Sequence, residues 1–159
     1  MSAMQPPSMI RKAFLSDAED IRALVNHFAS SGSVLPLSLH DTYDRLRDFL
    51  VYEGGEALVG CGALHISWKG LAELRSLVVR EENQGRGIGR RIVEHSLEDA
   101  SILGIEKVFV LPRIPEFFRR LGFADCPREY LPRKIWTDCV ECPRFPDCDA
   151  QALIRDLKA

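Results

Sequence analysis

The stretch LRSLVVREENQGRGIGRRIVEH, residues 74–95, decides the fold. It begins as an apolar strand, passes through a loop with three glycines, and continues as an amphipathic helix. The backbone N–H groups at the start of such a helix have no partner within the helix, and the helix dipole favours negative charge there. Arg86 and Arg90 can add charge-assisted hydrogen bonds to phosphate oxygens. The stretch therefore predicts a pyrophosphate site.

A glycine-rich loop before a helix also occurs in P-loops and in dinucleotide-binding folds. A P-loop requires Lys followed by Ser or Thr after its last glycine, and here Arg90 and Arg91 follow Gly89. A dinucleotide-binding loop opens a parallel βαβ unit, whereas this loop follows strands whose short turns predict antiparallel pairing. A purely structural role for the glycines stays open at this point.

The regions around the loop alternate between strand and helix patterns. Residues 49–79 form three strands separated by Gly-Gly and Lys-Gly turns, as in a β-meander. The helix after the loop ends at Gly104, which favours a left-handed cap. Residues 105–111 then read as a buried strand, and Pro115 begins a short helix that ends at Gly122. The pattern predicts an α+β fold.

The two ends of the chain carry further signals. A strand-like run near the N-terminus precedes Ser16 and Glu19, whose spacing resembles a capping box and predicts a helix start. Ser38 and Asp41 form a second box, before a shorter helix with Leu39, Tyr43, Leu46 and Leu50 in one apolar stripe. From about residue 126 the chain is rich in Pro and Cys, and residues 150–159 read as its last helical turns. We expect one domain over residues 1–159, with a core over about 9–125 and an extension over about 126–159.

Composition excludes several function classes. The chain has 159 residues and a formal net charge of −2, which gives no global basic field for nucleic acid. Its N-terminus lacks a signal-peptide pattern, and no apolar run approaches the length of a membrane span. We expect a cytoplasmic protein with a small-molecule partner, no nucleic acid and no membrane, while a homodimer stays open.

The loop closely resembles the signature of the GNAT superfamily of acetyl-CoA-dependent N-acetyltransferases. That signature is a V-x-V strand followed by Q/R-x-x-G-x-G/A, with Gln84, Gly87 and Gly89 in the signature places, and the likeness covers about residues 9–123. It implies a three-layer fold with a twisted, mixed, mostly antiparallel sheet flanked by helices, and acetyl-CoA or coenzyme A as the cofactor and donor. The cofactor-binding residues that it implies are Leu77, Val78, Val79, Gln84, Gly85, Arg86, Gly87, Ile88, Gly89, Arg90 and Phe118.

Within the superfamily, VGCGALH, AELRSLVV, KVFVL, EFFRRLGF and the tail resemble the short bacterial N-acetylglutamate synthases of arginine biosynthesis. This resemblance implies direct attack of the α-amine of L-glutamate on the thioester. Two positions depart from it: Leu37 stands where the branch has arginine, and Pro112 stands where it has threonine. Another small amine or amino acid as acceptor therefore stays open, as does a non-catalytic acetyl-CoA-binding regulatory module.

Acetyl transfer requires a base for the amine proton and a way to release the thiolate. Glu73 is the expected base, because it resembles the carboxylate of many relatives at this position, although it could instead pair with Arg75. Many relatives protonate the thiolate with a tyrosine where this chain has Phe118, so Tyr130 or water is the expected donor. The expected substrate-binding residues are Arg75, Leu37, His65, Arg113 and Lys134, with Arg133 as a further cation.

The cysteines allow two interpretations. Cys126, Cys139, Cys142 and Cys148 could hold zinc or part of an iron–sulfur cluster, since the last three are spaced as C-x2-C-x5-C. Zinc sites usually contain two C-x2-C pairs, however, and Cys126 has no close partner in sequence. Free thiols or a disulfide within the tail are therefore favoured, and no metal is predicted. Cys61 is expected to be a core residue.

Overall fold

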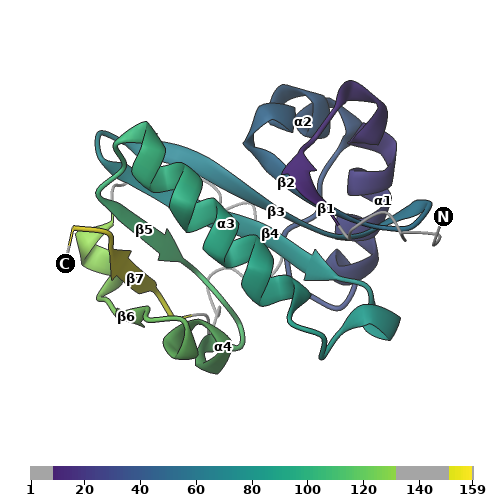
Figure 1. Ribbon diagram of the computed structural model, residues 1–159. Helices are drawn as coiled ribbons and strands as arrows, with labels where there is room; N and C mark the ends of the chain where they lie inside the picture. Colours follow the sequence, from purple (N-terminus) through teal and green to yellow (C-terminus); the bar gives the residue numbers. More distant parts are fainter. Residues whose placement is uncertain (1–8, 132–150, 159) are drawn as a thin grey trace, which may run out of the picture. The chain divides into compact units, whose positions relative to one another are not determined.

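The computed structural model describes residues 9–131 and 151–158 (Figure 1). The chain forms two compact units, one from residues 1–64 and 76–96, the other from 65–75 and 97–159. Three elements run from one unit into the other: β3 (Ala57–Trp68), β4 (Leu71–Val79) and α3 (Ile88–Leu103). The division into a core and an extension of one domain stays a prediction.

The first unit contains the predicted meander. Its strand order is β1-β2-β3-β4, where β1 (Met9–Lys12) pairs antiparallel with β2 (Phe49–Gly54), and β2 pairs antiparallel with β3. Val51 lies opposite Cys61, and the turn between β2 and β3 places Gly55 at a φ of 82°. Such a backbone conformation favours glycine, which explains the Gly-Gly turn.

The first helix of this unit begins at a different signal from the one predicted. Helix α1 (Ala18–Ala29) follows the 3₁₀ turn η1 (Leu15–Asp17). The predicted box at Ser16 is wrong: the carboxylate of Asp17 accepts the N–H of Phe14 at 2.6 Å and folds the chain into this entry turn. Arg11 donates to the same carboxylate at 2.7 Å, and this pairing lowers the pKa of Asp17. A local cap is therefore present, but it joins Phe14 and Asp17 in place of Ser16 and Glu19.

The second predicted capping signal is present. Ser38 Oγ accepts the N–H of Asp41 at 3.0 Å at the start of α2 (Leu39–Asp44), which continues into η2 (Leu46–Asp48). The predicted apolar stripe is partly wrong, because Tyr43 is exposed and Thr42 is buried instead. Thr42 Oγ donates to the Ser38 carbonyl at 2.8 Å, so its hydroxyl can be buried without losing a hydrogen bond.

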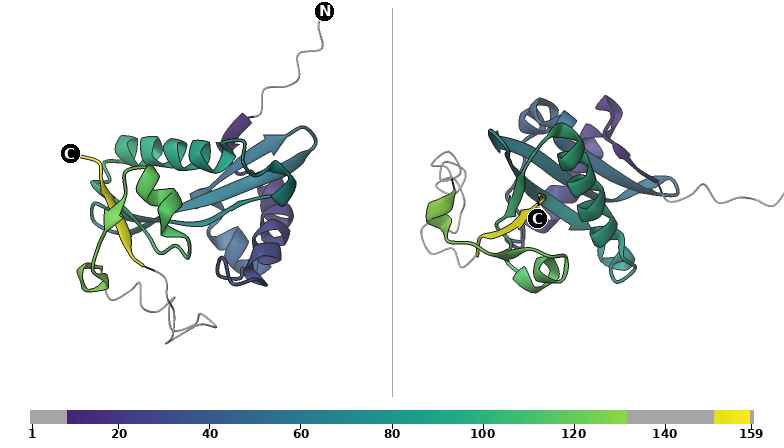
Figure 2. Two further views of the ribbon diagram at one scale, coloured as in Figure 1. Left: turned by 90° about the horizontal axis from the view of Figure 1, so that it is seen from below. Right: turned by 60° about the vertical axis from the view of Figure 1, so that its left-hand side comes forward.

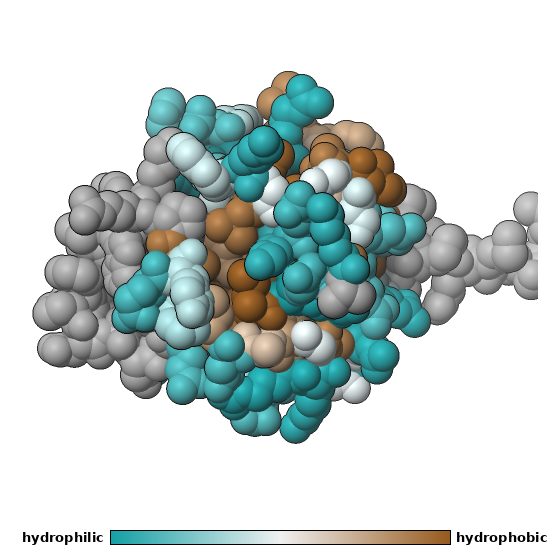
Figure 3. Space-filling view, turned by 90° about the vertical axis from the view of Figure 1, so that its left-hand side faces the viewer, coloured by the Kyte–Doolittle hydropathy of each residue, from teal (hydrophilic) through white to brown (hydrophobic). Residues whose placement is uncertain are grey.

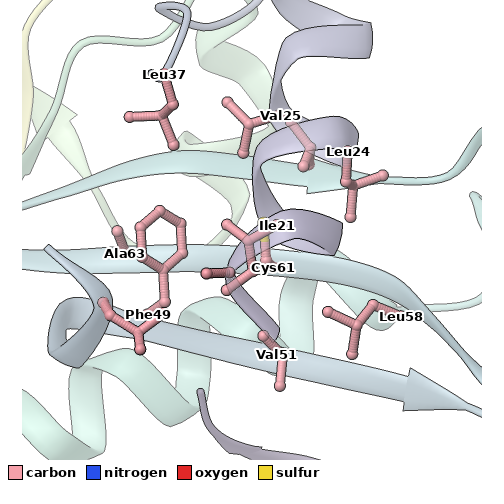
Figure 4. Close-up of a cluster of buried hydrophobic side chains, with 12 residues drawn as sticks. Ile21, Leu24, Val25, Leu37, Phe49, Val51, Leu58, Cys61 and Ala63 are labelled. Atoms are coloured by element: carbon pink, nitrogen blue, oxygen red, sulfur yellow. The ribbon is translucent and has the colours of Figure 1, made fainter. Parts of the chain in front are cut away.

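A hydrophobic cluster joins α1 to the sheet of the first unit. Ile21, Leu24 and Val25 of α1 pack against Phe49 and Val51 of β2 (Figure 4). The cluster also includes Leu37, Leu58, Cys61, Ala63 and Val78. Its side chains are almost inaccessible to solvent, so burial of apolar surface stabilises this packing.

The second unit contains the remaining strands, in the order β4-β5-β7-β6. Strand β5 (Lys107–Val110) runs parallel to β4, and β7 (Leu153–Asp156) runs antiparallel to both β5 and β6 (Ala124–Asp125). Helix α4 (Pro115–Arg120) precedes β6 and begins at Pro115, as the sequence predicts. Antiparallel pairs thus predominate in a mixed sheet, which confirms the expected α+β class.

The predicted C-terminal helical turns are wrong. Residues 153–156 form β7, a strand paired on both sides, with β5 along one edge and β6 along the other (Figures 1 and 2). Leu153 and Leu157 have the spacing of a helix face, but the sheet satisfies the backbone hydrogen bonds of this segment. Tertiary pairing therefore overrides a weak local period.

The surface carries apolar side chains among polar ones. On the face shown in Figure 3, hydrophobic residues gather in groups with hydrophilic residues around them. The exposed large side chains include Leu15, Ile66, Trp68, Ile102 and Ile114. Among the described residues, no helix has the length and apolar character needed to cross a bilayer.

Candidate active site

Strand β4 contains one residue with a left-handed backbone conformation, Ser76. This residue has a φ of 55° and is the only non-glycine residue with positive φ in the described part of the chain. Residues before it, Leu71–Glu73, pair in parallel with β5. A left-handed residue disrupts the alternation of side chains along a strand.

The second half of β4 packs closely against the start of α3. Leu77 and Val79 contact the apolar cluster that contains Ile88 and Ile92. A Cβ added at Gly60 of β3 would lie 3.1 Å from the carbonyl oxygen of Val78 and 3.2 Å from Ile92. Glycine at this position thus permits the close approach of strand and helix.

The loop after β4 folds back on itself. A 3₁₀ turn, η3 (Glu81–Asn83), is closed by hydrogen bonds from Asn83 N–H to the Arg80 carbonyl and from Gln84 N–H to the Glu81 carbonyl. The side-chain amide of Gln84 donates to the Val79 carbonyl at 2.9 Å. The Gln84 side chain therefore closes the loop, whereas the sequence predicts it only as a cofactor contact.

Two of the three loop glycines have left-handed backbone conformations. Gly85 has a φ of 80° and Gly87 a φ of 81°, and a Cβ added at either would meet no atom within 4 Å apart from its own chain neighbours, among the described residues. Glycine is thus required by backbone conformation, and the space beside it is open. Gly89 lies within the first turn of α3.

The first turn of α3 presents backbone donors. Arg91 N–H donates to the Gly87 carbonyl at 3.1 Å, so the intrahelical ladder begins there. The N–H groups of Ile88, Gly89 and Arg90 precede this first bond. Arg90 pairs with Glu94 at 2.7 Å. The side chain of Arg86 is exposed. These groups provide the positive end of a 16-residue helix, which can bind a phosphate.

The first half of β4 carries a buried ion pair. Arg75 Nη1 lies 3.6 Å from Glu73 Oε1, and their side chains are only 13% and 11% exposed. Glu73 lies opposite Phe109 of β5 in the sheet register. A carboxylate held in this way can accept a proton, and a buried guanidinium can bind a carboxylate. The predicted base and the predicted cation are therefore adjacent.

The other predicted residues of the second unit occupy different environments. Phe118 is buried in α4 and packs edge-on against Phe117 and Phe123, with ring centroids 5.0 and 5.5 Å apart. Tyr130, in η4 (Arg128–Tyr130), is 78% exposed. His65 is half-buried at the end of β3, and Arg113 is exposed before α4. Lys134, Arg133, Cys139, Cys142 and Cys148 lie outside the described residues.

Leu37 is a core residue of the first unit. Its side chain is 7% exposed and points toward Val25 and Phe49 (Figure 4). The side-chain amide of Asn26 fixes its backbone, donating to the Leu37 carbonyl and accepting the Leu37 N–H, both at 2.8 Å. Sequence patterns contain no signal for this contact, since Asn26 lies within a helical period. The role of Leu37 in substrate binding stays a prediction.

Both cysteines in the described ranges are free thiols. Cys61 is fully buried, and burial raises its pKa to about 12. Its Sγ lies 3.7 Å from the carbonyl oxygen of Ser76. Cys126 is half-buried, and burial raises its pKa as well. Across residues 9–131 and 151–158, no group of His, Cys, Asp or Glu has a geometry that could hold a metal ion.

The sequence matches known acetyltransferases. The family model described as Acetyltransferase (GNAT) domain matches residues 45–125, just over half of the chain. The N-acetyltransferase CT2212 of Chlorobaculum tepidum is 38% identical over 148 residues, which cover 93% of this chain and 96% of that protein. An amino-acid acetyltransferase of Mycobacterium tuberculosis is 38% identical over 120 residues, which cover 74% of this chain and 68% of the relative.

Solved structures show the same fold. Rv2747 of Mycobacterium tuberculosis, crystallised in complex with coenzyme A, matches with a TM-score of 0.78 and 29% identity, over 93% of this chain and 98% of that one. N-acetylglutamate synthase of Neisseria gonorrhoeae, complexed with coenzyme A and N-acetyl-glutamate, matches with a TM-score of 0.86 and 26% identity. That match covers 96% of this chain and 36% of the larger synthase.

Proposed function

The chain belongs to the GNAT acetyltransferase family, and from this premise we propose that it transfers the acetyl group of acetyl-CoA to the α-amine of L-glutamate. The observation that carries the acceptor is the likeness to an amino-acid acetyltransferase at 38% identity, over most of both chains. The family assignment itself confirms the prediction made from the glycine loop.

The donor half of the proposal rests on the loop before α3. The pyrophosphate of coenzyme A would accept hydrogen bonds from the amides of Ile88, Gly89 and Arg90, with Arg86 supplying charge. Open space beside Gly85 and Gly87 supports this assignment, because the phosphates can approach the backbone there. The relative Rv2747 was crystallised with coenzyme A, which supports the same donor.

We assign the base role to Glu73. The neutral amine nitrogen of the acceptor attacks the thioester carbonyl carbon, the carbon–sulfur bond breaks, and the amine proton passes to the Glu73 carboxylate directly or through water. Burial of Glu73 beside Arg75 supports this role, since such a site keeps the carboxylate in one position. The released thiolate takes a proton from water or from Tyr130. A thiol with a pKa of about 8.5 leaves without full protonation, so no dedicated acid is required.

The acceptor carboxylates require cations. Arg75 is our first candidate because it is largely buried beside the proposed base, while Arg113, Lys134 and His65 are further candidates. The planar guanidinium of an arginine can bind a carboxylate through two parallel hydrogen bonds.

A second candidate function, acetylation of a different small amine or amino acid, is favoured by one observation. Leu37, which stands where the glutamate-acetylating branch that the sequence resembles has arginine, is buried among apolar side chains. This position therefore offers no cation for a substrate carboxylate.

The test is thiol release from acetyl-CoA, measured with glutamate and with a panel of amino acids and polyamines at equal concentrations. We expect turnover with glutamate to exceed turnover with every other amine. Preferred turnover of another amine would replace the first function by the second. If coenzyme A raises the melting temperature but no amine is acetylated, the chain is a binding module instead of an enzyme. Failure of coenzyme A to bind would contradict the donor assignment.

A further inference from the structure

One residue holds the start of the glycine loop to strand β3. The backbone N–H of Arg80 donates to the Val59 carbonyl at 2.8 Å, and its side-chain Nε–H donates to the Leu58 carbonyl at 2.7 Å. The Arg80 carbonyl accepts the N–H of Asn83 at 2.9 Å and thereby closes η3. Arg80 thus connects the strand on one side with the turn on the other.

A second contact reaches the same turn from α1. His27 Nε2 lies 2.7 Å from Glu81 Oε1, and this partner lowers the pKa of Glu81. Both side chains are 61% exposed, so solvent screens the pair and it contributes little. The Arg80 side chain is half-buried and donates to a backbone carbonyl, which makes it the stronger anchor.

The loop beyond Arg80 has little packing of its own. Gly85 and Gly87 adopt left-handed conformations in open space, and glycine loses more conformational freedom on ordering than other residues. If the loop is ordered in only a fraction of molecules, the affinity for a ligand of the ordered form falls by that fraction. Anchoring the turn therefore increases the affinity for the ligand without contacting it.

We propose that Arg80 is a positioning residue for the proposed coenzyme A site: its side chain fixes the loop against β3, so that the first-turn amides of α3 meet the pyrophosphate. The inference rests on the proposed donor. It assigns Arg80 a role that differs from that of the phosphate-binding groups themselves, because Arg80 acts through the backbone of residues 81–87.

The first test compares coenzyme A binding by calorimetry in full-length Arg80→Met, Arg80→Lys and Arg22→Met proteins. Methionine keeps much of the aliphatic stem and removes the donors, and Arg22 is an exposed arginine of α1 that serves as the matched control. We expect Arg80→Met to raise the Kd about tenfold, because a hydrogen bond from a charged donor is lost. The Kd of Arg80→Lys should lie between those of Arg80→Met and the wild type, and Arg22→Met should bind coenzyme A as the wild type does. An unchanged Kd in Arg80→Met would overturn the proposal.

Two further readouts separate positioning from general loss of structure. The KM for acetyl-CoA should rise in Arg80→Met, whereas the KM for S-acetyl-pantetheine, which lacks the pyrophosphate, should stay near its wild-type value. Equal losses for both donors would contradict the proposal. Hydrogen exchange of the ligand-free protein should quicken at residues 85–90 and stay unchanged at residues 92–100. This readout does not depend on the proposed function, so a wild-type protein that fails to bind coenzyme A would refute that function while exchange still tests Arg80.

Discussion

The two halves of strand β4 differ in what their residues offer to a ligand. The half before Ser76 carries two charged side chains, Glu73 and Arg75, in a largely buried pair. The half after it, 77–79, is apolar, packs on α3, and leads through the glycine loop to the backbone amides of the first turn of α3. In the proposed function, the donor and acceptor sites therefore depend on separate kinds of interaction, backbone amides for the donor and charged side chains for the acceptor.

The largest expected effect is a loss of kcat on substitution of a residue in the charged half of β4. Glu73→Gln should lower kcat by about 10²- to 10⁴-fold, because general base catalysis contributes in that range. The loss of the acidic limb in the pH dependence of kcat/KM would accompany it. Steady-state thiol release measures both, and Glu98→Gln, at an exposed position of α3, is the matched control. A variant with kcat close to that of the wild type would show that Glu73 only pairs with Arg75.

The backbone half should respond to a glycine substitution instead. Gly87→Ala forces alanine into a left-handed conformation, which costs about 1–2 kcal/mol, so the Kd for coenzyme A should rise about tenfold. Gly104, at the other end of α3, has a φ of 84° and similarly open surroundings, so Gly104→Ala carries the same strain outside the loop. Calorimetry should detect weaker binding in Gly87→Ala alone. Equal weakening in both variants would show that the loop has no special role.

At the junction between the two halves of β4, a buried thiol should make the stability of the protein depend on pH. Burial raises the pKa of Cys61, beside Ser76, to about 12 from an ordinary value of 9.0. Above that ordinary value the unfolded thiol ionises while the folded one stays neutral, so stability is lost as pH rises, by about 1.4 kcal/mol per pH unit. Melting temperatures between about pH 8 and pH 10 should therefore fall less in Cys61→Ala than in the wild type. Parallel slopes would contradict this account, and Cys126→Ala, at a half-buried thiol, serves for comparison.

The smallest expected effect concerns the leaving group. Tyr130→Phe should change kcat by less than about twofold, because a thiolate of moderate basicity leaves without a dedicated acid. Tyr130 is also highly exposed in this structure. Thiol release at saturating substrate measures the effect. A large loss of kcat with unchanged coenzyme A binding would make Tyr130 the proton donor and add a third group to the acceptor side.

The glycine turns and the inward face of α3 are largely predictable from sequence because their signals are local. The positive φ values of Gly87, Gly104 and Gly122 each occur where a loop or helix end predicts them. The inward positions of α3, such as Ile92 and Val93, follow from helical period alone and are fully buried. Such features depend on residues within one or two turns of each other, so a single sequence contains them.

The remaining features depend on contacts between distant residues. The local sequence pattern of β7 predicts a helix. The two strands that pair with β7 lie far away in the chain, so the local pattern does not reveal this pairing. The residue type does not indicate the left-handed conformation of Ser76, because serine is common in regular strands as well. Asn26 reaches eleven residues ahead to hold Leu37, and Asp17 receives Arg11 from strand β1. These interactions form only when the elements that carry the two partners come together.

The most direct test of the separation between the halves of β4 is a calorimetric titration of coenzyme A into Glu73→Gln and Gly87→Ala. The account predicts that Glu73→Gln binds coenzyme A with wild-type affinity despite its low turnover, while Gly87→Ala binds about tenfold more weakly. Equal affinity in the two variants, or weaker binding in Glu73→Gln than in Gly87→Ala, would contradict it.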